Sequence, residues 1–164
     1  MQGRMGIRLV GAALAAMAVA PAAALAAKGK LDGFQEVPAI STTGSGKCTV
    51  KPVDGGLAVT LEYAGLKGQV TQAHVHLGQA GVNGGIAFFI CTNLGNGPMG
   101  TPACPPAPAT VTRTIVAGDV IAQAAQGLAA GDLAALLIAL KKKVTYCNVH
   151  TDLFPGGEIR ALLK

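Results

Sequence analysis

Hydrophobic and polar residues alternate along several short stretches of the chain, which is the pattern of half-buried β-strands. In LAVTLEY, at residues 57–63, every second residue is apolar and faces one side. In QVTQAHVHL, at residues 69–77, the apolar face alternates with one that carries Gln72, His74 and His76. Alternation, continuous apolar runs or β-branched residues predict strands at residues 57–63, 69–77, 85–90, 109–116, 144–151 and 157–163. With the strand-like segment around Cys48, about seven strands are expected.

The pattern changes between residues 118 and 142, where one or two short helices are expected. Asp119 and Asp132 can each cap an Ala- and Leu-rich segment, and the second segment ends in cations that suit a helix C-terminus. Residues 31–48 are turn-rich and should cross a sheet edge in extended form. This is too little helix to cover a parallel sheet, so we predict one all-β domain, an antiparallel sandwich or barrel.

The N-terminus has the composition of a secretory signal. Arg4 and Arg8 precede an apolar run that ends in small residues, and Ala24-Leu25-Ala26 fits cleavage before Ala27. An uncleaved membrane anchor is the alternative interpretation. Removal of residues 1–26 would lower the formal net charge from +5 to +3 and leave residues 27–164 as a periplasmic or secreted domain with no membrane partner.

Four cysteines in an exported chain favour disulfides, because an oxidising compartment preserves them. Three pairings exist. Cys91 and Cys104 bracket a Gly- and Pro-rich loop that a bridge would stabilise, which leaves Cys48 with Cys147. Metal thiolates are the competing idea, but no C-x-x-C spacing occurs.

The chain has three histidines, and two of them are one residue apart. His74 and His76 project from one face of a strand, so they can offer two imidazoles to one ion, and His150 could complete a three-nitrogen site. Neutral imidazoles suit copper first and zinc second, and three ligands leave an open coordination position. Asn148, on the face of His150, could orient an imidazole. The alternative is that all three rings only form hydrogen bonds.

Other chemistry has little support in the sequence. The single basic run, Lys141-Lys142-Lys143, has no interleaved aromatic residues, so nucleic acid is not expected as a partner. Ser41 and Ser45 have no carboxylate–histidine pattern around them, and GQAGVNGG, at residues 78–85, lacks the ending of a phosphate loop. We therefore expect no enzyme activity.

Four motifs together resemble one known family. GFQEVPAISTTGSG, AHVHLGQAGVNGG, YCNVHT and PGGEIRALL are similar, in order and spacing, to the chordin-type (CHRD) domain, a module of chordin and of many exported bacterial proteins. The resemblance covers about residues 31–163. The family positions fall on Ala73, His74, His76, Gly78, Gly81, Asn83, Gly84, Asn148, His150, Thr151, Pro155, Gly156, Gly157, Glu158, Ile159 and Arg160. Cys147 and Ala161 depart from the pattern, and the first departure fits an added disulfide to Cys48.

The resemblance implies an immunoglobulin-like Greek-key barrel that is distantly similar to copper/zinc superoxide dismutases. Those enzymes hold copper with four histidines and zinc with further ligands, which three histidines cannot supply. The expected function is thus a non-catalytic binding module with a copper or zinc site at His74, His76 and His150. The alternatives are a metal-free extracellular interaction domain with an unknown protein partner and, less favoured, a metal-dependent oxidoreductase.

Overall fold

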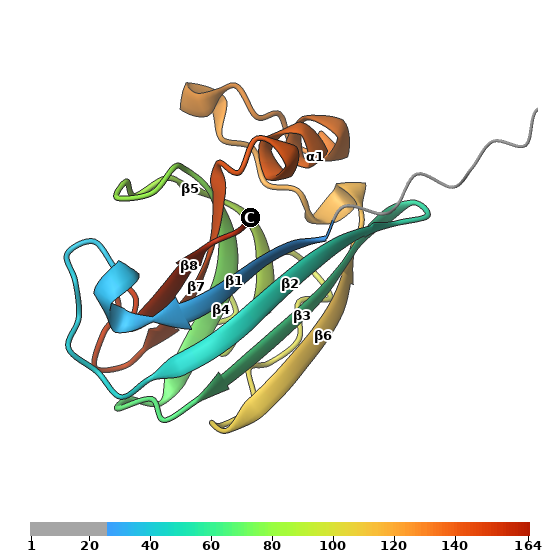
Figure 1. The fold of residues 1–164 in the computed structure, drawn as a ribbon. Coiled ribbons are helices and arrows are strands. Elements are labelled where there is room, and N and C mark those ends of the chain that lie inside the picture. Colours follow the sequence, from blue (N-terminus) through green and yellow to red (C-terminus); the bar gives the residue numbers. More distant parts are fainter. Residues whose placement is uncertain (1–25) are drawn as a thin grey trace, which may run out of the picture.

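A computed structural model describes residues 26–164 and shows one antiparallel sheet of eight strands (Figure 1). The strands are β1 (Ala27–Asp32), β2 (Ser45–Val53), β3 (Gly56–Ala64), β4 (Val70–Leu77), β5 (Gly85–Thr92), β6 (Ala109–Ile115), β7 (Thr145–Thr151) and β8 (Ile159–Leu162). They lie in the order β5-β4-β7-β8-β1-β2-β3-β6. The sheet curls into a nearly closed barrel, which confirms the predicted all-β class and selects the barrel form.

The two edge strands, β5 and β6, are bridged by side chains where the barrel does not close. Arg113 of β6 donates to the carbonyl oxygen of Phe89 on β5 and pairs with Asp119 in the short 3-10 turn at Ala117–Asp119. Both ionic side chains are mostly buried, so the pair is shielded from water. These contacts connect β5 and β6, the two edge strands, which are not hydrogen-bonded to each other as neighbours in the sheet.

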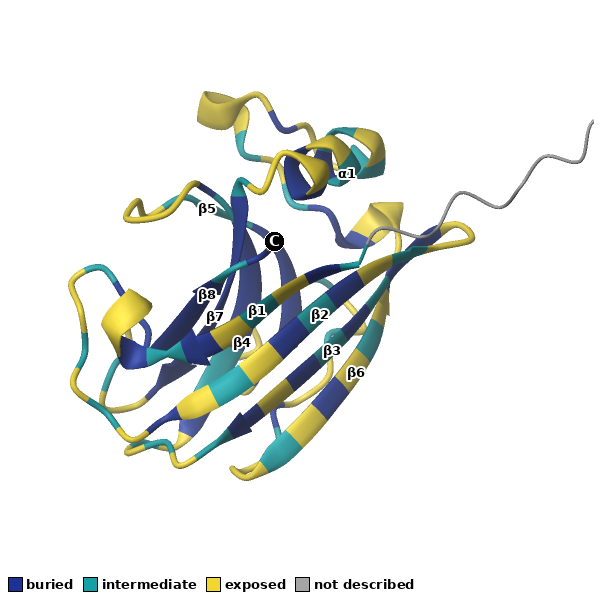
Figure 2. Ribbon diagram, viewed as in Figure 1, coloured by how far each residue is buried: buried dark blue, intermediate teal, exposed yellow. Residues whose placement is uncertain are grey.

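The core fills the inside of the barrel, and the alternation of the strands explains its composition. Four inward residues of β2 and β3 are at most 1% exposed: Val50, Leu57, Val59 and Leu61. The outward positions of the same strands are mostly half-buried or exposed, as the bands of colour in Figure 2 show. On β4 and β7 both faces are largely buried, because loops cover the outer face. This second buried layer contains the histidines.

One helix, α1 (Leu133–Lys141), lies against one end of the barrel (Figure 1). The Asp132 side chain accepts a hydrogen bond from the Ala135 amide at 2.8 Å, as the predicted cap requires, and Leu136 and Leu140 are buried. Asp119 does not cap a helix. Its carboxylate accepts from the Val116 amide and from Arg113, and only 3-10 turns occur between this residue and α1. One α-helix is therefore present where one or two were expected.

The segment at residues 31–48 differs from the expectation. Leu31 belongs to β1 and Cys48 to β2, and both strands lie inside the sheet order and not at its edge. Gly29 allows this arrangement, because a Cβ there would lie 2.6 Å from that of Ala161. Only residues 33–44 form the connecting loop.

The predicted signal segment, apart from Ala26, lies outside the described residues. Among residues 26–164, no helix has the length and apolar character needed to cross a membrane.

Candidate metal centre

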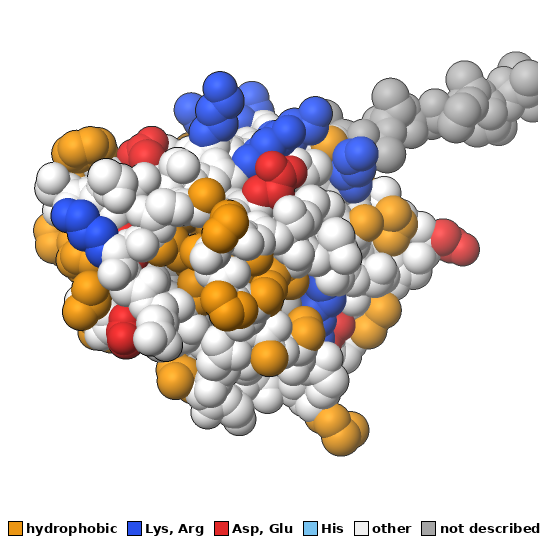
Figure 3. Space-filling view, turned by 90° about the horizontal axis from the view of Figure 1, so that it is seen from below, with side chains coloured by type: hydrophobic (Ala, Val, Ile, Leu, Met, Phe, Trp, Pro, Cys, Tyr) orange, Lys and Arg blue, Asp and Glu red, His pale blue; other side chains and the backbone are white. Residues whose placement is uncertain are grey.

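The two central strands of one barrel wall bring the three histidines together. β4 and β7 pair antiparallel, with His74 opposite Asn148 and His150 opposite Gln72, so His150 lies diagonally across from His74. One ring nitrogen from each of the three histidines can be chosen so that all lie within 4.8 Å of one another. The histidines are 1–7% exposed, and none is visible on the face of the described residues shown in Figure 3. His150 therefore lies close to the H-x-H pair, which is the condition for a three-nitrogen site that the sequence left open.

Two backbone carbonyl groups fix two of the rings. The Nδ1 atom of His76 lies 3.0 Å from the carbonyl oxygen of Gly84, and that of His150 lies 2.9 Å from the carbonyl oxygen of Pro155. A carbonyl oxygen can only accept, so each Nδ1 carries the proton and donates it. In the neutral ring, the Nε2 atom then keeps an available lone pair, which is the state that binds metal.

The remaining ring nitrogens have no hydrogen-bond partner. Nε2 of His76, Nε2 of His150 and both ring nitrogens of His74 are buried and unpaired among the described residues. A buried polar atom without a partner is unfavourable by about 1–3 kcal/mol, and such atoms are uncommon in folded proteins. Four of them in one cluster mark a place where a ligand can supply the missing interactions.

The surroundings keep the imidazoles neutral. Burial, reinforced by His150 and His76, lowers the pKa of His74 to about 2. Burial lowers the pKa of His76 to about 4, although the bond to Gly84 opposes the shift. Burial also lowers the pKa of His150, against the bond to Pro155. At neutral pH all three rings are unprotonated and need release no proton to bind a cation.

Aromatic contacts hold the rings from the sides. The Tyr146 ring stacks on His76, with centroids 4.5 Å apart and planes 4° from parallel, while Phe89 meets His74 edge-on at 4.4 Å. The Arg160 guanidinium lies over the Tyr146 ring, 3.4 Å from its centroid. The ring planes are thereby fixed by packing as well as by hydrogen bonds.

Asn148 differs from its predicted role of orienting an imidazole. Its side-chain amide donates to Glu36 and, at 3.4 Å, to the carbonyl oxygen of Ile159. Gly157 makes room for this pair, because a Cβ there would lie 2.5 Å from both Asn148 Nδ2 and Glu36 Oε1. The imidazoles are oriented by main-chain carbonyls instead. Asn148 therefore holds Glu36, a residue of the 33–44 loop that was not among the predicted site residues.

A cavity of about 240 Å³ opens beside the cluster. Its walls are formed by Glu36, His76, Asn83, Gly84, Tyr146, Asn148, His150, Gly156 and Arg160. Two of the three histidines thus border a space that is large enough for a small ligand.

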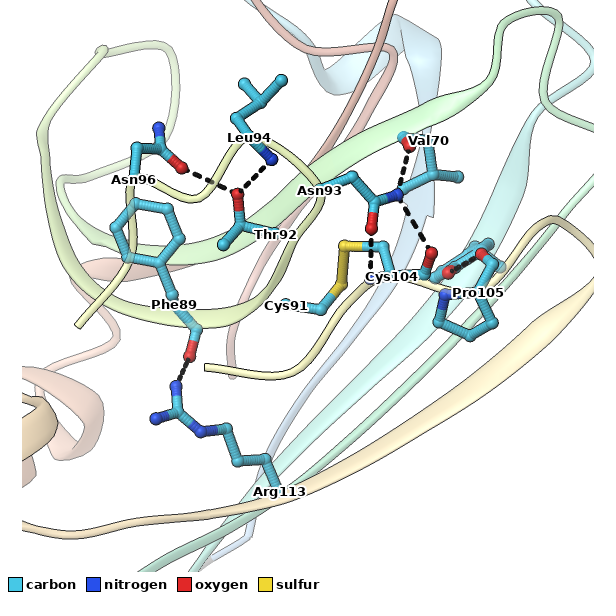
Figure 4. The surroundings of a disulfide bond; sticks show 11 residues. Val70, Phe89, Cys91, Thr92, Asn93, Leu94, Asn96, Cys104, Pro105 and Arg113 are labelled. Carbon is cyan, nitrogen blue, oxygen red and sulfur yellow. Dashed lines mark hydrogen bonds between the residues drawn. A yellow bond between two sulfur atoms is a disulfide. The ribbon is translucent and has the colours of Figure 1, made fainter. Parts of the chain in front are cut away.

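The Cys91–Cys104 disulfide is present, as predicted, with an S–S distance of 2.03 Å (Figure 4). It anchors the loop together with Asn93, whose side chain bonds the Val70 carbonyl oxygen and both the amide and the carbonyl oxygen of Cys104. The bridge lies at the end of β5, outside the histidine cluster.

The second predicted disulfide is not formed. Cys48 and Cys147 are free, fully buried thiols that lie beside each other in the core. Burial, together with the neighbouring Cys48, raises the pKa of the Cys147 thiol well above its ordinary value. This suppresses the thiolate that disulfide formation requires, so the two residues pack as small apolar side chains.

Comparison with known proteins gives one match. No curated protein and no solved structure is similar enough to match the chain. The family profile described as the CHRD domain matches residues 28–163.

Proposed function

The chain belongs to the CHRD domain family, and on this premise we propose that it is a non-catalytic metal-binding module that acts outside the cytoplasm. His74, His76 and His150 would hold the ion through three neutral imidazole nitrogens. Copper(II) is the first candidate and zinc the second, because affinity for divalent ions at nitrogen sites peaks at copper. When bound, either ion would supply a Lewis-acid centre with one replaceable coordination position.

The observation that carries this proposal is the set of unpaired nitrogens. A purely structural role would explain the Nδ1 atoms of His76 and His150, which donate to carbonyl oxygens. It would not explain why the two Nε2 atoms and both nitrogens of His74 are buried without a partner. Metal coordination accounts for the Nε2 atoms of His76 and His150, whose tautomers the backbone bonds select, and for one nitrogen of His74, because each histidine offers one ligand atom within 4.8 Å of the others. The second nitrogen of His74 carries the proton of the neutral ring.

Three properties of the chain support a place in an oxidising compartment. The Cys91–Cys104 bridge would persist there, the N-terminus reads as an export signal, and chordin-type domains are extracellular modules. Periplasm and external medium both meet these requirements.

Titration of copper(II) and zinc into the oxidised, tag-free chain from Ala27 onward tests the proposal. At pH 7.5 we expect one ion to bind per chain, and we expect the His74→Ala/His76→Ala double variant to lose that binding. Gln72→Ala is the matched control, because Gln72 precedes His74 by two residues on the same strand. At pH 5 the apparent affinity should stay close to that at pH 7.5, because burial lowers the pKa of His74 to about 2 and that of His76 to about 4, so protons do not compete for these rings.

Unfolding curves of each variant show whether the fold is retained. If the wild-type chain binds no more metal than the double variant, the histidines have only a structural role. The function would then be that of the alternative, a metal-free interaction domain.

A further inference from the structure

The cavity beside the histidines contains two opposite charges that the metal site does not use as ligands. Glu36 and Arg160 both line it and are 6% and 3% exposed. The two side chains come from different parts of the fold, Glu36 from the loop after β1 and Arg160 from β8. Charged side chains are rarely buried this deeply unless they are paired, and here both also border a cavity that a ligand can enter.

Arg160 retains hydrogen-bonding capacity. Its Nη atoms donate to the side chain of Asn83, at 2.9 Å, and to the carbonyl oxygen of Val82. These bonds account for two of its five N–H donors. Its stacking on Tyr146, which in turn stacks on His76, holds this positive charge close to the histidine cluster.

The charge balance of the loaded site is positive. Three neutral imidazoles bring no negative charge, so a divalent ion would keep its full +2, and Arg160 adds a further positive charge. Glu36 can offset at most one unit. Burial also raises the pKa of Glu36 to about 7, against the influence of Arg160 and the hydrogen bonds to Val37 and Asn148. A small region of low dielectric with net positive charge attracts an anion.

The size of the cavity limits what can enter. At about 30 Å³ for each water in the liquid, the 240 Å³ cavity corresponds to about eight molecules. This is space for an anion of a few atoms and excludes a peptide or a nucleotide.

We propose that the cavity binds a small monovalent anion, such as a short carboxylate or azide, which takes the coordination position left open by His74, His76 and His150. The inference rests on the metal site proposed above. Arg160 strengthens anion binding and Glu36 weakens it, so these two residues set the affinity in opposite directions. Asn148 positions Glu36 by its hydrogen bond to the carboxylate.

Azide titration of the copper(II)-loaded chain at pH 7.5 tests the proposal, with the azide-to-copper charge-transfer absorption as the signal. A charge a few ångströms away across a partly buried cavity should change affinity by about tenfold. We expect Glu36→Gln to bind azide several-fold to about tenfold more tightly, and Arg160→Gln to bind it about tenfold more weakly. Arg160→Lys, which keeps the charge but not the planar fork, should be intermediate.

Glu36→Gln is the decisive variant, because a glutamine oxygen can still accept from Asn148 and the fold should be kept. Glu62→Gln and Lys47→Gln are matched controls that remove the same charges from outward positions on β3 and β2, and both should bind azide as the wild type does. Arg160→Gln also loses contacts to residues 82–83, so its interpretation requires an unchanged unfolding curve.

The outcomes separate the two proposals. Failure of copper to bind overturns the metal site and the anion site together. Stoichiometric copper binding with no azide absorption, or with equal azide affinity in the wild type and Glu36→Gln, overturns the anion site alone.

Discussion

Replacing His74 by leucine should stabilise the metal-free protein. His74 is 1% exposed and neither of its ring nitrogens has a hydrogen-bond partner among the described residues. Each such nitrogen is unfavourable by about 1–3 kcal/mol, and leucine is a similar-sized side chain with no polar atom to satisfy. After allowance for imperfect packing against Phe89, we expect His74→Leu to raise the free energy of unfolding by about 2 kcal/mol at pH 7.5.

The advantage of His74→Leu should grow in acid. Folding lowers the pKa of His74 from its ordinary 6.5 to about 2, so below pH 6.5 the unfolded chain binds a proton that the folded chain does not. Wild-type stability therefore falls by about 1.4 kcal/mol per pH unit in this range, or about 2 kcal/mol between pH 6.5 and pH 5. His74→Leu has no imidazole at this position, so it does not lose this part of the stability in acid.

Urea unfolding of both proteins with a chelator present, at pH 7.5 and pH 5, measures these differences. His76→Leu is the matched control, because that ring donates to the carbonyl oxygen of Gly84 and its removal leaves the acceptor without its partner. The increase in the free energy of unfolding should be smaller for His76→Leu than for His74→Leu. A less stable metal-free His74→Leu, or a difference that is the same at both pH values, would refute the reasoning and indicate that His74 supports the fold.

Two further predictions concern other buried groups. Glu158→Gln should lower the free energy of unfolding by about 2–4 kcal/mol in urea at pH 7, because the carboxylate accepts from Thr42, Thr151 and the amides of Lys67 and Gly68. Burial alone would raise the pKa of Glu158, but these hydrogen bonds outweigh burial and lower the pKa. The loss of unfolding free energy in Glu158→Gln should therefore shrink as pH falls below 4.5. A loss that does not depend on pH would contradict this account. Alkylation in denaturant followed by mass spectrometry should label two cysteines without reductant and four after reduction; no labelling without reductant would show that Cys48 and Cys147 are bridged.

Much of the barrel could be predicted from the sequence because alternation reports directly which strand faces are buried. The strands at residues 57–63 and 69–77 show this period clearly, and the structure contains them as β3 and β4. β1 was missed because its sequence AKGKLD offers only Ala27, Gly29 and Leu31 as inward residues, a weak signal in six residues. Its place in the sheet depends on distant partners, β2 and β8, that local sequence does not specify.

Part of the candidate site could also be predicted from the local sequence, and part depends on contacts between distant segments. The shared face of His74 and His76 follows from strand geometry, but the diagonal contact with His150 requires the register between β4 and β7. Glu36 is 112 residues from its partner Asn148, and nothing in its local sequence indicates that it is buried. The thiol state of Cys48 and Cys147 likewise depends on burial, which a count of cysteines does not report.

The pairing register of β7 determines both how the core packs and whether the histidine cluster forms. Cys147 and Val149 face the core while Tyr146, Asn148 and His150 face the covered outer side, and every residue of the strand is buried. If β7 paired one residue out of register, the two sets would exchange sides, placing polar groups in the core and thiol and valine at the cluster. A misfolded chain of this kind would lose stability and the histidine cluster in the same step. A compact, misregistered population that lacks the cluster should therefore not accumulate.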